Sequence, residues 1–377
     1  MHILFAGGGT AGHINPALSV ANYLTANYKD VKISYIGTEH GLESRLVPAA
    51  GYDFYTIKAT GFQRKPSLEN IKKNIVAVEN AIEGSVKARK LIKELKPDVV
   101  VGTGGYVSGP VLREAALLGI PTAIHEQNAY PGVTTKMLIK HVDRVMLAMP
   151  EAKARLDSKK DYSVTGNPVR EALIFADREN NREKLGIPSD KPLVLSFGGS
   201  LGAKCINEAV VALAGYAHTS HSFYLYHGTG RSGFETTSAA IKQAVGESED
   251  PFVTVVEYIN NMDELLSAAD LVICRAGAIT LGELQVCGKA SVLIPSPYVA
   301  ENHQYFNALT LKNAGAAELI EEKQLTGEIL LDTVKKMISD PELLEKMGKN
   351  ARESAIVDSN KKIAEVILSL VKSEQKQ

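Results

Sequence analysis

Two glycine-rich turns stand where an apolar run meets a helix-like segment, and both have the composition of a phosphate-binding loop. The first is Gly7–His13 (GGGTAGH), which follows the apolar run Ile3–Ala6, and the second is Gly198–Lys204 (GGSLGAK), which follows Leu193–Phe197. A glycine turn that opens a helix brings backbone N–H groups and the positive helix end close to a phosphate. Gly202 is followed by alanine rather than lysine, so the second turn is not a Walker A loop. We therefore expect phosphate binding at both turns.

An alternative for the first turn is a dinucleotide-binding loop, because Gly7, Gly9 and Gly12 satisfy the pattern G-x-G-x-x-G. Such a loop needs a carboxylate at the tip of the second strand to bind the adenosine ribose. The predicted strand Lys32–Ile36 runs instead into glycine and threonine, which disfavours a nicotinamide or flavin cofactor. His13 is expected to point toward whatever the turn binds, unless it only makes a structural hydrogen bond at the start of the helix.

A carboxylate and a polar loop follow two later strands. The segment after the strand Leu271–Cys274 contains a glycine turn and then a helix, in whose first turns Glu283 lies. Such a carboxylate can accept hydrogen bonds from a diol such as a ribose, although the helix macrodipole alone also favours an acid there. The loop after the strand Ser291–Pro295 is dense in donors and acceptors and ends at His303 and Gln304. Open α/β sheets bind ligands at the carboxyl ends of their strands, so we expect these residues at a binding site.

Short apolar runs alternate with helix-length segments along the chain, a pattern typical of parallel sheets buried on both faces. Two successive series of such β–α units predict two Rossmann-like domains. The break between them is expected at Thr165–Pro168, which is marked by glycine and proline. The other predicted strands are Asp98–Val101, Thr122–His125, Arg144–Ala148 and Tyr162–Val164 in the first series, and Ser222–His227 and Phe252–Glu257 in the second.

The composition restricts the classes of protein to which the chain can belong. Its 377 residues suit two domains, and its formal net charge of −1 gives no overall basic excess for nucleic-acid binding. Cys205, Cys274 and Cys287 are too few and wrongly spaced for a disulfide framework or a zinc site, and they fit a reducing compartment. We find no signal peptide and no apolar run of roughly 18 residues, so no membrane-spanning segment is expected.

One segment of the first domain is locally basic. Lys58–Lys96 contains ten basic residues and four acidic ones. Within it Leu68, Ile71, Ile75, Val78 and Ile82 recur at helical spacing and form one apolar stripe. The stripe has two interpretations: it is ordinary core beside a solvated basic face, or it attaches the first domain to an anionic lipid surface.

Taken together, these motifs resemble the MurG family of bacterial N-acetylglucosaminyltransferases, over nearly the whole chain and in the family's order. The residues that carry the resemblance are GGTAGH at 8–13, GGYVSGP at 104–110, HEQN at 125–128, GNPVR at 166–170, GGSLGA at 198–203, CRAGA at 274–278, Thr280, Glu283, His303, Gln304, Asn307 and Ala308. The HEQN and GGYVSGP motifs are far more specific than a glycine loop. Ala11 and Leu201 depart from the glycine and glutamine common in the family.

The resemblance implies the GT-B glycosyltransferase fold, an α/β architecture of two Rossmann-like domains facing a cleft. Residues 1–165 would form the acceptor domain and 166–344 the donor domain, with a C-terminal helix at about 345–377 packing back on the first domain. The implied reaction is the inverting transfer of N-acetylglucosamine from UDP-N-acetylglucosamine to the 4-hydroxyl of undecaprenyl-pyrophosphoryl-N-acetylmuramoyl-pentapeptide. It belongs to peptidoglycan synthesis and takes place at the cytoplasmic face of the membrane, on an anionic surface and with cell-wall synthesis proteins as possible partners.

The resemblance also assigns site residues. On the donor side, backbone groups around Ile259 would bind the uracil, Glu283 the ribose and Ser200 the diphosphate. Further donor-side positions are Arg170, Arg275, His303 and Gln304, and the acceptor-side positions are Thr10, Ala11, Gly12, Tyr106, Glu126 and Asn128. His13 and Glu126 are the rival candidates for the base that takes the proton of the acceptor hydroxyl. The chain has no Asp-x-Asp motif, so we expect no metal and no cofactor, with helix amides and arginine stabilising the leaving diphosphate.

Three other functions stay open at this stage. The chain could be a glycolipid glycosyltransferase, a UDP-N-acetylglucosamine 2-epimerase, or a non-catalytic nucleotide-sugar-binding protein. An epimerase needs no lipid acceptor and a binding protein releases no UDP, so turnover with and without acceptor separates them.

Overall fold

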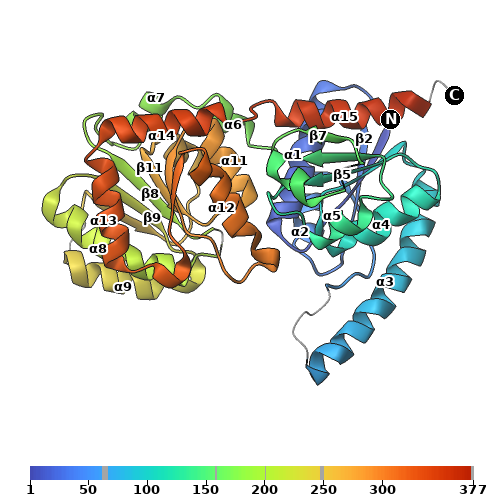
Figure 1. Cartoon of the computed structure of the whole chain (residues 1–377), viewed down its shortest axis with the longest axis horizontal. Coiled ribbons are helices and arrows are strands. Elements are labelled where there is room, and N and C mark those ends of the chain that lie inside the picture. Colours follow the sequence, from blue (N-terminus) through green and yellow to red (C-terminus); the bar gives the residue numbers. More distant parts are fainter. Residues whose placement is uncertain (62–66, 158, 200, 247–249, 375–377) are drawn as a thin grey trace. The chain divides into compact units, whose positions relative to one another are not determined.

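The computed structural model describes residues 1–61, 67–157, 159–199, 201–246 and 250–374, and it divides into two compact units. Unit 1 comprises residues 1–169 together with 358–377, and unit 2 comprises residues 170–357. Each unit holds one parallel sheet with helices packed on it (Figure 1). The predicted α/β class with two Rossmann-like domains is confirmed, and the two units are described separately below.

Unit 1 contains a seven-stranded parallel sheet in the order β3-β2-β1-β4-β5-β6-β7. The central strands are apolar along their whole length because helices cover both faces of the sheet. The strands are β1 His2–Ala6, β2 Lys32–Gly37, β3 Asp53–Thr56, β4 Val99–Gly102, β5 Thr122–Glu126, β6 Arg144–Leu147 and β7 Tyr162–Val164. The edge strand β3 was not predicted, because it is short and none of its four residues is fully buried.

Two helical layers enclose this sheet. The helices α3 (Leu68–Leu95), α4 (Gly105–Leu117) and α5 (Val133–Leu138) pack on one face. The helices α1 (Ala11–Asn27), α2 (Glu43–Ala49) and α15 (Ser359–Glu374) belong to the core on the other face. In α15, the side chains of Ile363, Ala364 and Ile367 are buried in that second core. Figure 1 shows α15, in red, beside α1.

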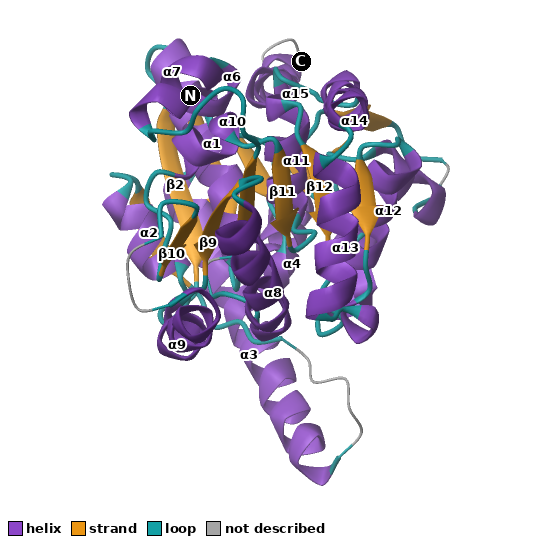
Figure 2. Cartoon of the chain, turned by 90° about the vertical axis from the view of Figure 1, so that its left-hand side faces the viewer, coloured by secondary structure: helices purple, strands orange, loops and turns teal. Residues whose placement is uncertain are grey.

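Unit 2 has a six-stranded parallel sheet in the order β10-β9-β8-β11-β12-β13 (Figure 2). Its strands are β8 Leu193–Phe197, β9 Tyr224–Gly228, β10 Val253–Val256, β11 Leu271–Cys274, β12 Ala290–Leu293 and β13 Ala317–Leu319. Its helices are α6 Glu171–Ile174, α7 Arg178–Lys184, α8 Lys204–Ser220, α9 Phe234–Val245, α10 Met262–Ala268, α11 Ala278–Cys287, α12 His303–Asn313, α13 Gly327–Ile338 and α14 Pro341–Glu353. The short edge strand β13 was not predicted.

The boundary of the returning C-terminal segment differs from the prediction. We expected residues from about 345 to pack on the first domain, but α14 belongs to unit 2 and the return begins at residue 358. The reason is that α14 packs on α11: Met347 and Ala351 are buried, and the Gln285 side chain donates to Ser354 Oγ at 2.9 Å. The first boundary lies between Val169 and Arg170, a few residues after the expected position at 166.

The long helix α3 carries two apolar faces. Its inner face, with Ala77, Ala88 and Ile92, is buried in the core of unit 1. The stripe singled out above points elsewhere: Ile75 is 56% exposed and Ile82 is 64% exposed, and Val78 is exposed as well. The interpretation of these positions as ordinary core is therefore wrong. Val86, 67% exposed, extends the stripe by one turn, whereas the side chains of Leu68 and Ile71 lie outside the described residues.

A buried charge network stabilises the start of unit 2. Arg182 is fully buried, and its guanidinium donates to Asp270 Oδ2 at 2.9 Å and to the Ala268 carbonyl at 3.0 Å. Asp270 also accepts hydrogen bonds from Arg178 at 2.6 Å and from the Leu193 amide at 2.7 Å. Asp270 thus connects α7 to the first residue of β8. Burying a charge is tolerated only when it is paired and hydrogen-bonded in this way.

We predict that Asp270→Ala destabilises unit 2 by about 3–5 kcal/mol, because it leaves the buried Arg182 without its counter-charge. Urea denaturation of the variant and of the wild-type chain measures this difference. The exposed Asp332 on α13 provides the control, and Asp332→Ala should stay within about 0.5 kcal/mol of wild type. A loss below about 1 kcal/mol for Asp270→Ala would show that the network contributes little.

Candidate functional site

In unit 1 the first glycine turn lies where the strand order reverses direction. The order of the sheet puts β1 beside β4, so the turn after β1 meets the loop after β4. Gly105, with φ at +75°, approaches the Gly8 carbonyl so closely that a Cβ would collide with it. Gly9, with φ at +88°, lies against the ring of Tyr106. Such a switch point at the carboxyl ends of parallel strands is the usual ligand site of an open α/β sheet.

His13 lies in the first turn of α1 and is partly exposed. Its Nδ1 is 3.1 Å from the Gly8 carbonyl oxygen and 3.4 Å from Thr10 Oγ1. Because a carbonyl oxygen can only accept, Nδ1 carries the hydrogen, and the lone pair of the neutral ring is then on Nε2. Burial lowers the pKa of His13 below its ordinary 6.5, although the hydrogen bond to Gly8 and the charges of Glu126 and Glu43 oppose this effect. The ring is therefore neutral at neutral pH and has a basic nitrogen available.

Glu126, the last residue of β5, is only 3% exposed and has four hydrogen-bond donors around it. Its Oε1 accepts from the backbone and side-chain nitrogens of Asn128, both at 3.1 Å. Its Oε2 accepts from the Gly132 amide at 2.9 Å and from Thr135 Oγ1 at 2.6 Å. All four hydrogen bonds come from Asn128, Gly132 and Thr135, so the carboxylate holds the loop 127–132 and the start of α5 in place.

The other predicted residues of unit 1 are exposed or partly exposed, whereas two further residues of the HEQN motif are buried. Thr10 and Gly12 are exposed, Ala11 is half-buried, and Tyr106 is 37% exposed. The neighbours of Glu126 within the HEQN motif are buried: His125 Nε2 donates to the Gly166 carbonyl at 3.0 Å, and Gln127 Nε2 donates to the Thr103 carbonyl at 2.9 Å. Thr10, Ala11 and Gly12 thus lie beside His13 on the first turn, whereas His125 and Gln127 stabilise the neighbouring loops.

Sequence analysis missed one charged residue of this site. Glu43, the first residue of α2, is completely buried, and its carboxylate lies under the first glycine turn. It accepts hydrogen bonds from the Gly9 amide at 3.3 Å and from the backbone and hydroxyl of Thr38 at 3.0 and 2.7 Å. The only available signal was an acid placed shortly after the end of β2, among the glycines at 37 and 41.

In unit 2 the second glycine turn occupies the equivalent position, where β8 lies beside β11. Gly202, with φ at +75°, is packed against the Thr229 carbonyl, and Gly230 lies against Gly202 in turn. No side chain would fit at either contact. Ser200, the residue predicted to bind the diphosphate, lies outside the described residues.

Glu283 on α11 is paired with Arg170, at the start of unit 2. The Arg170 Nε atom donates to Glu283 Oε1 at 2.9 Å, and the same guanidinium forms an ion pair with Asp263, the second residue of α10. Burial raises the pKa of Glu283, the charge and hydrogen bond of Arg170 lower it, and the charge of Asp263 raises it. One arginine therefore holds two carboxylates together, and two of these three residues are predicted site residues.

Arg275 faces the interior of unit 2. Its guanidinium forms an ion pair with Glu322 at 2.6 Å and donates to the Ile294 carbonyl at 3.2 Å and to Cys205 Sγ at 3.3 Å. Cys205 is in the first turn of α8, which the glycine turn opens. The positive charge of Arg275 is therefore neutralised by Glu322 in this structure. The ion pair lies close to the positive, N-terminal end of α8.

The remaining predicted residues stabilise the loops at the same ends of the strands. Gln304 Oε1 accepts from the Ser296 amide at 2.9 Å, and His303 Nδ1 donates to the Ala300 carbonyl at 2.8 Å. Both bonds fold the loop 296–302, in which Glu301 and Asn302 have positive φ values of 55° and 50°. Ile259 is buried against Gly228 at the end of β9.

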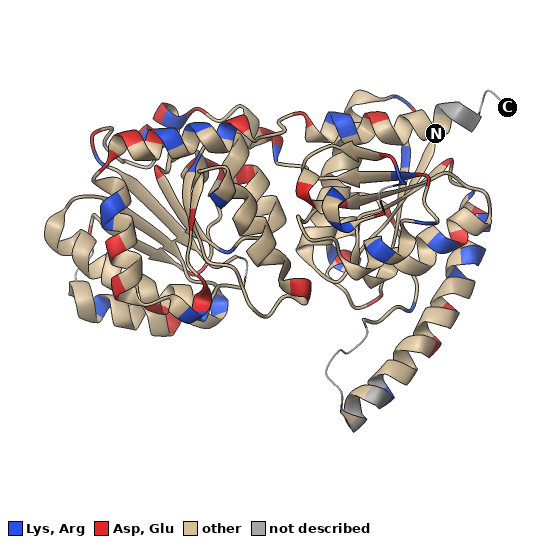
Figure 3. Cartoon of the chain, viewed as in Figure 1, with Lys and Arg blue, Asp and Glu red and all other residues tan. Residues whose placement is uncertain are grey.

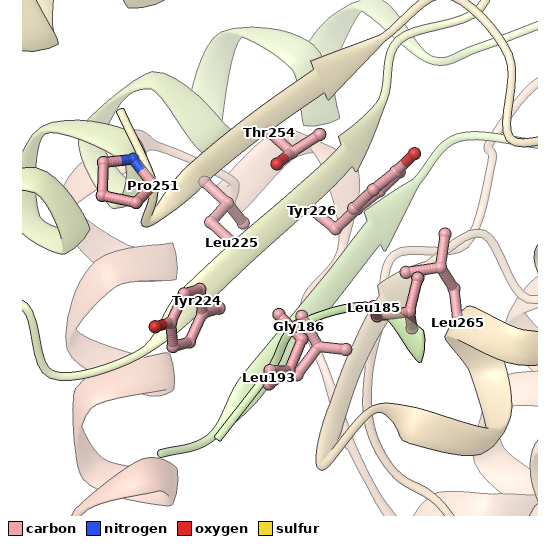
Figure 4. A pocket seen from close by; sticks show the side chains of 10 residues that line it. Leu185, Gly186, Leu193, Tyr224, Leu225, Tyr226, Pro251, Thr254 and Leu265 are labelled. Atoms are coloured by element: carbon pink, nitrogen blue, oxygen red, sulfur yellow. The ribbon is translucent and has the colours of Figure 1, made fainter. Parts of the chain in front are cut away.

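A separate hollow of about 110 Å³ lies in unit 2. Figure 4 shows it lined by Tyr224, Tyr226 and Leu265, with Leu193 and Pro251 near the amino ends of their strands. No predicted site residue that the structure describes lines this hollow, so it is distinct from the glycine-turn site. Among the described residues, no group of three or more His, Cys, Asp or Glu side chains is arranged to hold a metal ion.

The architecture of two Rossmann-like units, each with a glycine turn at its switch point, is that of the GT-B glycosyltransferases, and the family comparisons identify the class. Residues 3–147 match the Glycosyltransferase family 28 N-terminal domain, and residues 193–366 match the Glycosyltransferase family 28 C-terminal domain. The chain belongs to glycosyltransferase family 28.

Relatives of known name agree with this assignment. A protein of Acetivibrio thermocellus is 45% identical over 99% of both chains, and its name is UDP-N-acetylglucosamine–N-acetylmuramyl-(pentapeptide) pyrophosphoryl-undecaprenol N-acetylglucosamine transferase. The crystal structure of Acinetobacter baumannii MurG is 30% identical, with a TM-score of 0.77 over 98% of this chain and 99% of that one. A UDP-GlcNAc 2-epimerase of Neisseria meningitidis covers 98% of this chain and all of its own at a TM-score of 0.65. Its 15% identity shows a shared fold only.

The pairing of Arg170 with two carboxylates makes a prediction about the pKa of Glu283. Replacing Arg170 by Met should raise this pKa, because the opposing positive charge is lost. Replacing Asp263 by Asn should lower it, because a repelling negative charge is lost. A ¹³C NMR titration of the Glu283 carboxyl carbon measures both shifts. Equal pKa values in wild type and both variants would contradict the described network.

Proposed function

We propose that the chain transfers N-acetylglucosamine from UDP-N-acetylglucosamine to the 4-hydroxyl of undecaprenyl-pyrophosphoryl-N-acetylmuramoyl-pentapeptide, with inversion at the anomeric carbon. The observation that carries this proposal is the 45% identity, over 99% of both chains, to a relative whose name states this donor and this lipid-linked acceptor. The presence of both family 28 domains supports it. The reaction would convert the lipid-linked monosaccharide into the lipid-linked disaccharide of peptidoglycan synthesis.

On the donor side we assign the ribose to Glu283. The contact with Arg170 uses Oε1, so we assign the ribose hydroxyls to the second carboxylate oxygen, Oε2. The backbone around Ile259 would bind the uracil, and Ser200 with the amides that open α8 would bind the diphosphate. His303 and Gln304 would contact the sugar hydroxyls, and Arg170 and Arg275 would place positive charge near the donor.

On the acceptor side we assign the base to His13, with Thr10, Ala11, Gly12, Tyr106 and Asn128 around the acceptor. The acceptor 4-hydroxyl oxygen would attack the anomeric carbon while its proton passes to His13 Nε2. The bond from the anomeric carbon to the phosphate oxygen would break, and its electron pair would leave with UDP. Glu126 is the weaker candidate because its carboxylate is bound by four donors.

The release of UDP tests the reaction. We expect UDP from UDP-N-acetylglucosamine only when a lipid-linked or short-chain N-acetylmuramoyl-pentapeptide acceptor is present. Formation of UDP-N-acetylmannosamine without acceptor would indicate a 2-epimerase instead. Binding of the donor without turnover in either condition would indicate a non-catalytic protein.

For the donor side, we predict that Glu283→Ala raises the donor KM by one to two orders of magnitude. The loss of a buried hydrogen-bond acceptor for the ribose costs about 1–3 kcal/mol. Steady-state kinetics with varied UDP-N-acetylglucosamine measures the effect, with the exposed Glu345→Ala on α14 as control. An unchanged donor KM in a folded Glu283→Ala variant would remove Glu283 from the site.

For the acceptor side, we predict that His13→Ala lowers kcat by roughly 10²–10⁴-fold, because a general base is lost. The acidic limb of the pH profile of kcat/KM in wild type should lie below pH 6.5, since burial lowers the pKa of His13 and the neutral ring is the active form. The exposed His141→Ala is the control. If Glu126→Gln abolishes kcat in a folded protein while His13→Ala retains it, Glu126 is the base.

The proposed acceptor is a membrane lipid, and we infer that α3 attaches unit 1 to the cytoplasmic face of the membrane. The exposed stripe Ile75, Val78, Ile82 and Val86 offers apolar groups for insertion between lipids. Lys72, Lys90 and Lys93 are exposed on the same helix, and Figure 3 shows basic residues along it together with a few acidic ones. Among the described helices, none is long and apolar enough to cross a bilayer. We further propose that cell-wall synthesis proteins are partners on this surface.

Vesicle co-sedimentation tests the attachment. Each basic residue near an anionic surface contributes about 1 kcal/mol, so removing Lys72, Lys90 and Lys93 as Ala variants together should weaken binding about a hundredfold at low salt. Ile82→Ser with Val86→Ser should weaken it too, whereas Ile329→Ser on α13 should not. Binding to phosphatidylglycerol vesicles that none of these changes alters would exclude α3 as the attachment site.

A further inference from the structure

We propose that Glu43 is a positioning residue for His13 and acts on it through the single peptide group between Gly8 and Gly9. This inference rests on the proposed function only in that it takes His13 as the base. Glu43 touches neither His13 nor any atom assigned to a substrate. It would orient the imidazole and set which of its nitrogens carries the hydrogen.

The two ends of that peptide group have different partners. Its N–H, on Gly9, donates to Glu43 Oε2 at 3.3 Å. Its carbonyl, on Gly8, accepts from His13 Nδ1 at 3.1 Å. A carboxylate that accepts the N–H of a peptide polarises the group and makes its carbonyl oxygen a stronger acceptor. The stronger acceptor favours the tautomer with hydrogen on Nδ1, which leaves the lone pair of Nε2 for the acceptor hydroxyl.

The surroundings of Glu43 are built around its carboxylate. Gly8, Gly37 and Gly41 surround the side chain, and a Cβ on any of the three would collide with it. The carboxylate oxygens point to the ends of β1 and β2, so the charge does not merely cap the amides of its own helix α2. Among the residues that the structure describes, no lysine or arginine forms an ion pair with Glu43. A fully buried acid held only by neutral donors is costly to fold, which is typical of residues kept for a functional site.

The charges that act on His13 come from two elements. Glu43 on α2 and Glu126 at the end of β5 both raise its pKa, and burial lowers it. Glu126 has its own four donors, whereas Glu43 is the carboxylate that reaches the hydrogen-bonded peptide. Glu43 also raises the pKa values of Tyr35 on β2 and Tyr106 on α4, after burial as the larger cause. Its charge therefore acts across the first glycine turn as a whole.

The test compares Glu43→Gln with Glu114→Gln, a matched loss of a buried carboxylate from α4, where Glu114 pairs with Arg89 at 3.1 Å. In ¹⁵N NMR of the full chain, with His13 assigned from a His13→Asn variant, Glu43→Gln should lower the fraction of neutral His13 with hydrogen on Nδ1. It should also lower the pKa of His13, because a charge that raises this pKa is removed. Glu114→Gln should leave both unchanged.

In turnover, Glu43→Gln should lower kcat by about ten- to a hundredfold, the range found when carboxylates behind metal-bound histidines are removed. The donor KM should stay constant, and the acidic limb of kcat/KM should move to lower pH. If Glu43→Gln does not fold, Glu43→Asp takes its place. Aspartate keeps the negative charge, but its side chain is one methylene shorter, so the carboxylate lies farther from the Gly9 amide. The same change of tautomer with a smaller change of pKa is then expected.

The NMR measurement separates this inference from the proposed function, since it requires no substrate. An unchanged tautomer and pKa of His13 in the folded variant overturn the positioning role, whatever happens to turnover. A changed tautomer in a chain that releases no UDP supports the positioning role and contradicts the proposed reaction.

Discussion

Close contact between backbone segments at the switch points is the constraint on which the candidate site of each unit depends. At the first switch point Gly105 meets the Gly8 carbonyl, and at the second Gly202 meets the Thr229 carbonyl. Side chains are excluded at these contacts. No Cβ at these glycines therefore blocks the approach of a ligand to the backbone N–H groups of each turn. The parallel sheets determine where this happens, because they bring the ends of neighbouring strands to one edge. These contacts fix the positions of the loops, and the loops in turn determine where the polar side chains of each site lie.

Most of the architecture could be predicted from the sequence because it depends on local patterns. Apolar runs located eleven strands, and the two that were missed, β3 and β13, are short edge strands in which most residues are exposed or only partly buried. The resemblance placed a returning helix after residue 345, but it could not show that Met347 and Ala351 bury against unit 2. That boundary depends on which apolar surface a helix finds in the folded unit, and amphipathic spacing contains no such information.

The site was less predictable because its decisive facts are long-range. Glu126 was a reasonable candidate base until its four donors were located, three of them on the loop 127–132 and one, Thr135, on α5. Arg275 could be placed near a donor by resemblance, but its pairing with Glu322 requires the folded sheet. Glu43 left only a weak signal, an acid among glycines after β2, since an acid at the start of a helix is ordinary and its burial depends on the neighbouring turns. Motif analysis finds residues that resemble known site residues, and it misses those that act on them through the backbone.

The return of α15 to unit 1 has a consequence for the order in which the two units can finish folding as the chain is synthesised. Unit 1 is discontinuous in sequence, and the whole of unit 2 is synthesised between its two parts. All of unit 2 is therefore synthesised before unit 1 receives Ile363, Ile367 and Leu370, which belong to the core beside α1. Until those residues emerge, that face of unit 1 exposes apolar surface of the kind that chaperones bind. The first domain to be translated is thus the last to be finished.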